Sequence, residues 1–301
     1  MTLPSHVPVM LEEFLAALDP QPGQRLVDGT LGGGGHTRVL AERVGREGTV
    51  LALDRDPAAL AAAEQNLAGL PVSLAHASYR ELPDLLAQLG WPPVDGVLLD
   101  LGLSSDQLDD ASRGFSFDAD GPLDLRFDPS AGEPASRLVN QLRPENLANL
   151  IYEFGEERYS RRIARAIVAA RELAPIGTAA ELAAIVRKAV PRSRHDRIDP
   201  ATRTFQALRI AVNDELAALH DILRQLPNCV RPGGKVAVIS FHSLEDRPVK
   251  QAFRDDPRYR PLHRRPVTAG DDELARNPRA RSAKLRVAEV LAAMPDCLPT
   301  P

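Results

Sequence analysis

The first third of the chain alternates short apolar runs with segments of helical spacing. The apolar runs at residues 25–28, 49–54, 72–77 and 94–101 have the length of buried strands, and residues 57–67 place small apolar side chains on one helical face. Strands that alternate with helices are typical of βαβ units, in which helices cover both faces of a parallel sheet. The pattern therefore predicts an α/β fold with a mostly parallel sheet.

The strand pattern stops near residue 105. Residues 159–172, 178–190 and 202–226 have helical spacing, and no convincing strand occurs until after about residue 208. We therefore expect an insertion made of a loop and helices.

Strand signals return near the C-terminus. Residues 231–234 have the composition of a turn, residues 235–241 form a strongly apolar run, and residues 285–290 read as a last strand. Two strands alone are not stable in water, so these are expected to complete the first sheet. The expected domains are a discontinuous α/β domain and an inserted loop plus helical substrate-recognition domain, at residues 1–105 with 212–301 and at residues 106–211.

Composition favours a reducing compartment. The 301 residues include two cysteines, Cys229 and Cys297, which form neither a disulfide framework nor a zinc motif. The N-terminus lacks the pattern of a secretory signal, and no uncharged apolar run reaches the roughly 18 residues of a membrane span. We expect a cytoplasmic protein with no membrane partner. The sequence does not set its oligomeric state.

Charge is unevenly distributed along the chain. The net charge of −4 argues against a protein that coats nucleic acid. Residues 187–209 nevertheless carry seven basic side chains against two acidic ones, and residues 276–286 carry five basic side chains and no acidic one. Such segregation predicts a surface suited to phosphate groups. A solvated helix face is the alternative explanation for any single arginine.

The most informative motif lies in residues 27–36. An apolar strand reaches Asp28, four glycines follow at residues 32–35, and a helical segment then begins. Glycine lets the backbone approach a ligand closely, and a helix N-terminus offers it free N–H groups. The second strand ends at Asp54, 20 residues past Gly34, the spacing at which a carboxylate reaches ribose hydroxyls. The motif predicts a cofactor that contains adenosine.

The details of the motif favour S-adenosylmethionine (SAM) over NAD. In the dinucleotide-binding pattern the third small residue would fall on Thr37, whereas Asp28, Gly32 and Gly34 fit D-x-x-x-G-x-G. A carboxylate at this place would repel a pyrophosphate but suits the cationic amino-acid end of SAM. The catalytic Tyr/Lys or His partner of an oxidoreductase is also not evident.

Further polar residues follow strands whose carboxyl ends should meet at one crevice. Asp100 ends the fourth strand and is expected to face the same crevice as Asp28 and Asp54. Phe241 could stack on a splayed base, and His242 could contact substrate. The alternatives are a capping role for Asp100 and a structural role for His242. We predict no metal site, because no ligand spacing is recognisable.

Several long strings of residues, in order along nearly the whole chain, match one family. They are DGTLGGGGH at 28–36, DLGLSS at 100–105, GFSF at 114–117, FGEE at 154–157, PATRTFQALR at 200–209, SFHSLEDR at 240–247 and NPRARS at 277–282. Through them the chain resembles the bacterial 16S rRNA (cytosine-N4)-methyltransferase family called RsmH or MraW.

The resemblance implies a class I SAM-dependent methyltransferase fold, Rossmann-like, with an inserted all-helical domain. It implies methylation of the exocyclic N4 of one cytidine of 16S rRNA near the ribosomal P site, position 1402 in rRNA numbering. An exocyclic amine is a poor nucleophile, because its lone pair is delocalised into the ring, so its methylation needs a fixed acceptor for its N–H groups. Asp100 is the candidate acceptor.

The resemblance also implies the cofactor contacts. Carried over position by position, they are Gly34, Gly35, His36, Asp54, Tyr79, Asp100 and Gln107. Tyr79 stands where the family often has phenylalanine, and an aromatic ring can pack on adenine in either case.

The implied partner is 16S rRNA in the small ribosomal subunit, gripped by the basic clusters. The candidate contacts to its phosphates are Arg192, Arg194, Arg197, Arg203, Arg279, Arg281 and Lys284. A SAM-dependent methyltransferase acting on another RNA or on a protein is the main alternative. An RNA-binding protein without enzymatic activity would leave the glycine loop and the strand-end aspartates unexplained.

Overall fold

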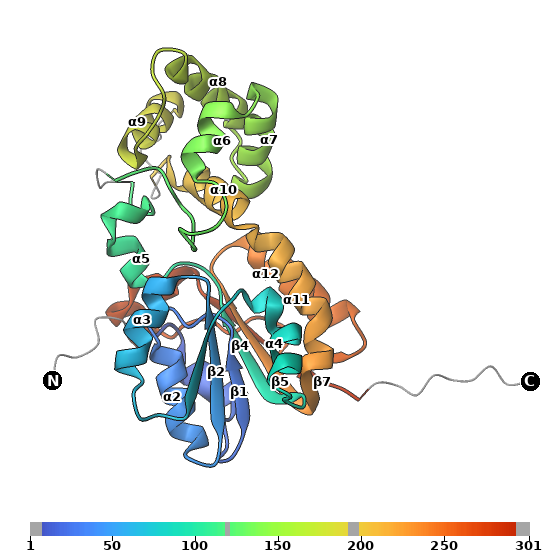
Figure 1. The fold of residues 1–301 in the computed structure, drawn as a ribbon. Coiled ribbons are helices and arrows are strands. Elements are labelled where there is room, and N and C mark those ends of the chain that lie inside the picture. Colours follow the sequence, from blue (N-terminus) through green and yellow to red (C-terminus); the bar gives the residue numbers. More distant parts are fainter. Residues whose placement is uncertain (1–7, 118–120, 192–198, 293–301) are drawn as a thin grey trace, which may run out of the picture. The chain divides into compact units, whose positions relative to one another are not determined.

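The chain folds into two compact units (Figure 1). The computed structural model describes three stretches of the sequence, residues 8–117, 121–191 and 199–292. The sheet unit comprises Met1–Gly102 and Leu216–Pro301, and the helical unit comprises Leu103–Glu215. Within the three described stretches, no helix is both long enough and apolar enough to cross a membrane.

A seven-stranded sheet forms the centre of the sheet unit, in the order β3-β2-β1-β4-β5-β7-β6. The strands are β1 (Arg25–Asp28), β2 (Thr49–Asp54), β3 (Val72–His76), β4 (Val94–Asp100), β5 (Val230–Ser240), β6 (Tyr259–Pro261) and β7 (Lys284–Val290). The strands from β3 to β5 pair in parallel, and β7 is antiparallel to both β5 and β6. The predicted mostly parallel α/β sheet is confirmed.

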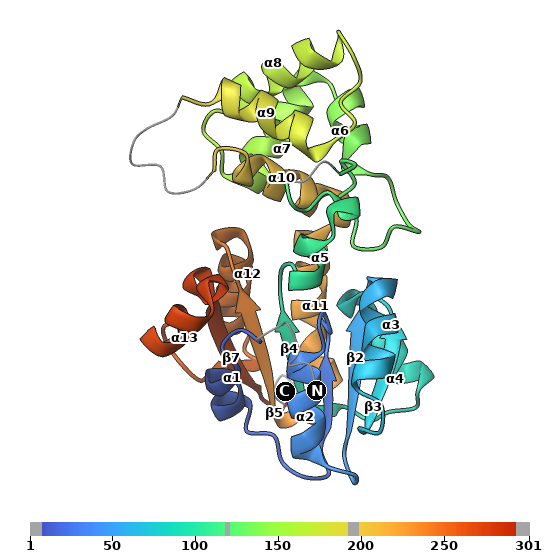
Figure 2. The ribbon, with the colours of Figure 1, turned by 90° about the vertical axis from the view of Figure 1, so that its left-hand side faces the viewer.

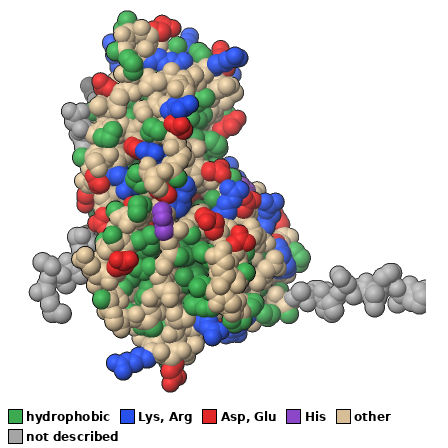
Figure 3. All heavy atoms as spheres, in the orientation of Figure 1, with side chains coloured by type: hydrophobic (Ala, Val, Ile, Leu, Met, Phe, Trp, Pro, Cys, Tyr) green, Lys and Arg blue, Asp and Glu red, His purple; other side chains and the backbone are tan. Residues whose placement is uncertain are grey.

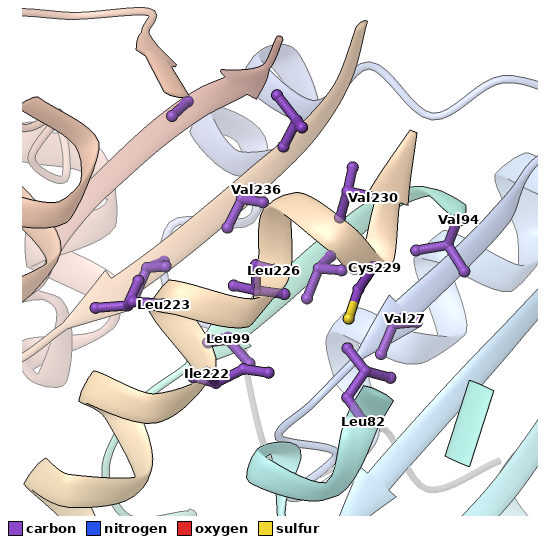
Figure 4. Close-up of a cluster of buried hydrophobic side chains, with 14 of the residues drawn as sticks. Val27, Leu82, Val94, Leu99, Ile222, Leu223, Leu226, Cys229, Val230 and Val236 are labelled. Atoms are coloured by element: carbon purple, nitrogen blue, oxygen red, sulfur yellow. The ribbon is translucent and has the colours of Figure 1, made fainter. Parts of the chain in front are cut away.

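Helices cover both faces of this sheet (Figures 1 and 2). One face carries α4 (Leu82–Gln88), α11 (Glu215–Cys229) and α12 (Ser243–Asp255), and the other carries α1 (Leu11–Leu18), α2 (Gly35–Val44) and α3 (Pro57–Asn66). Figure 4 shows Leu226 and Cys229 of α11 packed among Val27, Val94 and Val236 of the strands. Burying an aliphatic side chain of this size contributes roughly 1.5–3 kcal/mol, so this packing fixes the helices on the sheet.

Two features of the sheet differ from the sequence-based expectation. β5 begins at Val230 rather than at residue 235, because Val230 pairs with Val94 and the expected turn at 231–234 continues the strand with a register irregularity. The strand β6 has no counterpart in the sequence pattern. It has three residues, one of them Pro261, and its conformation depends on pairing with β7.

The helical unit is built from helices joined by loops. Its helices are α5 (Ser105–Asp109), α6 (Ala135–Gln141), α7 (Pro144–Gly155), α8 (Ser160–Arg171), α9 (Ala179–Ala189) and α10 (Thr202–Asn213), with the short η2 (Ala111–Arg113). They share a separate hydrophobic core that includes Leu147, Ile163 and Leu182. Among the described residues of this unit, the only β pairing is an isolated bridge between Pro122 and Thr178.

The expectation of one helix over residues 202–226 is wrong. The structure ends α10 at Asn213 and begins α11 at Glu215, with Asp214 between them at a φ of 53°. The buried Asn213 amide donates to the Leu125 and Arg209 carbonyl oxygens, and its Oδ1 accepts from the Phe127 N–H. These bonds to a distant loop fix the end of α10.

Candidate active site

Three aspartates end neighbouring parallel strands at the carboxyl edge of the sheet. Asp28 ends β1, Asp54 ends β2 and Asp100 ends β4, and β1 pairs with both other strands. The strand order reverses between β1 and β4, the place where open α/β sheets bind ligands. The structure therefore brings the three predicted carboxylates together within the sheet unit.

Asp28 is completely buried and is held by the loop that follows it. Its Oδ1 accepts hydrogen bonds from the Thr30 N–H (3.1 Å) and hydroxyl (3.4 Å), and its Oδ2 accepts one from the Thr37 hydroxyl (2.7 Å). Burial raises the pKa of Asp28 from 3.8 to about 6; these hydrogen bonds oppose the rise and the Asp54 charge adds to it. The residue that argued against a dinucleotide loop, Thr37, thus binds the carboxylate.

The glycine turn and Asp54 are joined by a hydrogen bond. Gly32 and Gly34 have φ angles of 49° and 75°, a region that side chains disfavour. The Gly32 N–H donates to Asp54 Oδ2 at 2.8 Å, and the Asp56 N–H donates to Oδ1 at 2.9 Å. Burial raises the pKa of Asp54, and these backbone hydrogen bonds oppose the rise. The carboxylate expected to bind ribose is therefore fixed in orientation by the glycine loop.

The start of α2 packs against the N-terminal segment. A Cβ atom at Gly35 would lie 2.4 Å from Pro8 Cγ, so glycine is required there. The next residue, His36, is buried; its Nε2 lies 3.1 Å from the Val9 carbonyl oxygen, and its ring packs edge-on against Phe14 with 5.3 Å between centroids. Neighbours remote in sequence thus fix the imidazole.

Asp100 lies between polar groups from three other elements. Its backbone N–H donates to the Thr30 hydroxyl at 2.6 Å, and its Oδ2 lies 3.5 Å from His36 Nδ1. Its Oδ1 is buried and has no hydrogen-bond partner among the described residues. Burial raises the pKa of Asp100 well above its usual value, and the negative charges of Asp28 and Glu245 add to the rise.

The chain after β5 adds a buried carboxylate to this edge. Glu245 in α12 accepts hydrogen bonds from the Phe241 N–H (2.8 Å) and the His242 N–H (3.3 Å), and its Oε1 lies 3.1 Å from His242 Nε2. A Cβ atom at Gly102 would lie 3.2 Å from the Phe241 ring. Glu245 is absent from the predicted site, although its position three residues after His242 is the spacing of a helix capping box. Thr30 is absent as well.

The electrostatics of this edge favour a cationic ligand. The charged neighbours that raise the three aspartate pKa values are themselves carboxylates, such as Asp54 near Asp28 and Glu245 near Asp100. A positive group would relieve this repulsion and the cost of burial. Within the described residues, no three His, Cys, Asp or Glu side chains are grouped to hold a metal ion.

Comparison with known proteins identifies the family. The family description "MraW methylase family" matches residues 4–291. The chain belongs to the MraW methylase family. Its relatives include the ribosomal RNA small subunit methyltransferase H of Deinococcus radiodurans, 54% identical over 290 residues that cover 96% of this chain and 91% of the relative. The protein of the same name from Thermomicrobium roseum is 49% identical over 308 residues, with 96% and 94% covered.

Solved structures are more distant. A putative rRNA methylase from Clostridium thermocellum aligns with a TM-score of 0.46 and 14% identity, and covers 95% of this chain and 100% of its own. A putative methyltransferase from Streptococcus mutans, solved with S-adenosylhomocysteine, has a TM-score of 0.43 and 10% identity, with 95% and 100% covered.

As an MraW-family methylase, the protein is a class I SAM-dependent methyltransferase and its cofactor is SAM. The site fits this group. SAM carries a sulfonium and an ammonium charge, which Asp28 can complement, and ribose hydroxyls, which Asp54 can bind. The positive φ of Gly34 and the N-terminus of α2 allow close approach of a ligand to the backbone.

Two further cofactor residues implied by the family pattern have different surroundings. Tyr79 begins η1 (Tyr79–Glu81), and a Cβ atom at Gly29 would lie 3.0 Å from Tyr79 Cβ, so Tyr79 lies beside the loop after β1. Gln107 belongs to the helical unit. It is buried and closes a capping box with Ser104, whose N–H donates to Gln107 Oε1 at 3.2 Å.

Only some of the predicted RNA contacts of the helical unit belong to the described residues. Arg192, Arg194 and Arg197 lie outside them, in residues 192–198. Arg203 in α10 is exposed, and its guanidinium donates to the Glu156 carbonyl oxygen at 3.2 Å. On the face drawn in Figure 3, Lys and Arg side chains stand among Asp and Glu side chains.

The predicted RNA contacts near the C-terminus lie in two neighbouring elements of the chain. Arg279 and Arg281 lie in η3 (Pro278–Ser282) and are exposed. Lys284 begins β7, and its Nζ lies 3.5 Å from Asp246 Oδ2, a carboxylate that also pairs with Arg286.

Proposed function

We propose that this MraW-family methylase transfers a methyl group from SAM to the exocyclic N4 of one cytidine of 16S rRNA in the small ribosomal subunit. The target is cytidine 1402 in rRNA numbering, near the P site, and the reaction takes place in the cytoplasm. The observation that carries the proposal is the buried Asp100 Oδ1, which has no hydrogen-bond partner among the described residues and lies beside the cofactor loop. The names of relatives 49–54% identical support rRNA as the substrate.

Asp100 supplies what an exocyclic amine lacks. Bound SAM would supply an electrophilic methyl group: the N4–C bond would form as the C–S bond breaks, the electron pair would stay on sulfur, and one N4 proton would need an acceptor. Asp100 Oδ1 accepts a hydrogen bond from the amine, which localises the nitrogen lone pair and orients it, and then takes the proton. A carboxyl group held by the backbone of β4 needs little reorganisation for this role.

The loop residues of the site would hold the cofactor. Asp54 binds the ribose hydroxyls with the lone pairs that its backbone partners leave unused. Tyr79 packs on the adenine, and Asp28 faces the cationic end of the ligand. The remaining contacts come from the glycine turn and the start of α2, and from α5: they are Gly32, Gly34, Gly35, His36 and Gln107.

The basic segments would hold the RNA. Arg279 and Arg281 of the sheet unit, with Arg203 of the helical unit, contact phosphates, and residues 106–211 act as the substrate-recognition domain. Phe241 stacks on the splayed base, and His242, held by Glu245, contacts the substrate. Phosphate contacts give affinity that falls with salt, which suits a large anionic substrate despite the net charge of −4.

The substrate class is tested by transfer of a labelled methyl group to small ribosomal subunits that lack the modification, followed by separation of RNA from protein. We expect label in 16S rRNA, and a loss of roughly 10²-fold or more in transfer by Asp100→Ala at saturating SAM. Label in protein or in another RNA would contradict the substrate. Full turnover of Asp100→Ala with SAM bound normally would contradict the acceptor.

A further inference from the structure

His36 is placed to control which oxygen of Asp100 a substrate meets. The two side chains come from α2 and β4, and His36 Nδ1 lies 3.5 Å from Asp100 Oδ2. Their side chains are 6% and 17% exposed, so little water competes for this contact. The distance is at the outer limit of a hydrogen bond, which is common in active sites before substrate binds.

The Val9 carbonyl fixes the tautomer of the imidazole. A carbonyl oxygen only accepts, so His36 Nε2, 3.1 Å away, carries a proton. The neutral ring then presents the lone pair of Nδ1 to Asp100 Oδ2. A proton on Asp100 Oδ2 lets that oxygen donate a hydrogen bond to the lone pair of His36 Nδ1.

The other groups that face Asp100 favour the same proton. Asp28 on β1 and Glu245 on α12 are both acidic, and Glu245 is itself paired with His242. Together with burial they raise the pKa of Asp100, so the carboxyl group retains a proton more readily than an exposed one. Oδ2 is then a donor to His36, and Oδ1 keeps the lone pairs of a carbonyl oxygen.

We propose that His36 is a positioning residue for Asp100: its Nδ1 holds Oδ2 and leaves Oδ1 as the oxygen that accepts the substrate amine. This inference rests on the proposed function of Asp100. When the N4 proton leaves to Oδ1, the proton of Oδ2 passes to Nδ1. The carboxyl group therefore keeps one proton throughout, and the imidazole takes up the charge.

Two substitutions at the same position separate the two interactions of the ring. In His36→Gln the side-chain amide reaches the place of Nε2 and can still bind the Val9 carbonyl, but no atom replaces Nδ1. In His36→Asn the amide reaches the place of Nδ1 and can still bind Asp100, but it is too short to reach the Val9 carbonyl. If His36 had only a structural role through the Val9 carbonyl, His36→Gln would be the milder of the two substitutions. If His36 positions Asp100, His36→Asn is the milder one.

At SAM concentrations that saturate each variant, we expect His36→Gln to lower kcat roughly 10- to 100-fold and to alter the pH profile of kcat. His36→Asn, which keeps the contact with Asp100, should lose less kcat than His36→Gln and keep the wild-type pH profile. Equal losses in both variants, wild-type kcat in both, or a change confined to the KM for SAM would each overturn the proposal.

A second readout needs neither cofactor nor RNA. In the SAM-free protein with ¹³C-labelled aspartate carboxyls, Asp100→Asn assigns the Asp100 signal by its loss. Because Nδ1 stabilises the protonated carboxyl, His36→Gln should move the Asp100 titration to lower pH, and His36→Asn should leave it in place. No movement, or movement to higher pH, would overturn the proposal, and it would do so whether or not the RNA substrate is correct.

Discussion

The hydroxyl of Thr30 accepts a hydrogen bond from the backbone N–H of Asp100 at 2.6 Å, although the two residues are 70 positions apart in the chain. The same hydroxyl donates to Asp28 Oδ1 at 3.4 Å. One threonine therefore connects the carboxylate of the cofactor loop with the proposed amine acceptor, across the point where the strand order reverses.

Removing this hydroxyl should weaken the site without changing its shape. Thr30→Val keeps the side-chain volume but leaves the Asp100 N–H without an acceptor, which costs roughly 1–3 kcal/mol. We expect a lower free energy of unfolding in urea and slower methyl transfer. Thr30→Ser, which keeps the hydroxyl, is the matched control. Wild-type stability of Thr30→Val, or an equal loss in Thr30→Ser, would contradict the assignment of the loss to this hydrogen bond.

Asp28 should make the free protein less stable at neutral pH. Its pKa is raised from 3.8 to about 6, so the native state disfavours the charge that the unfolded state carries freely. The cost is absent below pH 4, grows between pH 4 and 6, and reaches roughly 3 kcal/mol above this range. Asp28→Asn should therefore raise the free energy of unfolding at pH 7.5 by up to this amount and weaken SAM binding.

The pH dependence supplies the control for this prediction. Urea unfolding of the SAM-free protein at pH 4 and pH 7.5 should show the advantage of Asp28→Asn only at the higher pH. An equal advantage at both values, or none at pH 7.5, would refute the view that Asp28 is a destabilising buried charge.

Asp54 should matter for the cofactor more than for the fold. Asp54→Ala removes the carboxylate that is expected to bind ribose. It also removes the acceptor of the hydrogen bond from the Gly32 N–H. We expect SAM affinity, measured by calorimetry, to fall roughly 10- to 100-fold, the range for hydrogen bonds to a charged group. The control is Asp56→Asn, because Asp56 caps α3 through the Ala58 N–H. Equal losses of affinity in both variants would contradict the assignment of Asp54.

The exposed arginines of η3 should act on RNA alone. We expect the double variant Arg279→Ala with Arg281→Ala to raise the KM for small subunits and to reduce the salt slope of binding by about 1 for each phosphate that the variant no longer binds. SAM affinity should be unchanged. Arg46→Ala, at an exposed position after α2, is the control. A wild-type salt slope in the double variant would exclude η3 from the RNA surface.

The sequence pattern was sufficient to place the three aspartates. Asp28, Asp54 and Asp100 each end an apolar run, and parallel strands bring such ends to one edge whatever the details of packing. The glycine run was equally informative, because positive φ at Gly32 and Gly34 follows from local chemistry.

Contacts between distant side chains could not be predicted in the same way. The approach of His36 to Asp100 depends on the register of β4 and on the Val9 carbonyl, and neither has a signal in the sequence. The break after α10 has the same origin, because Asn213 binds a loop far away in the chain. The hydrophobic pattern predicts the helices and strands and where they end. Side-chain rotamers and long-range hydrogen bonds decide which side chains of the site touch one another.

The most direct test of the account is identification of the methylated nucleoside. Small subunits whose 16S rRNA lacks the modification are incubated with the protein and isotopically labelled SAM, and the RNA is digested and mapped by mass spectrometry. The account predicts one labelled nucleoside, N4-methylcytidine, at position 1402 in rRNA numbering. Label on a ring carbon, on ribose or at another nucleotide would contradict it.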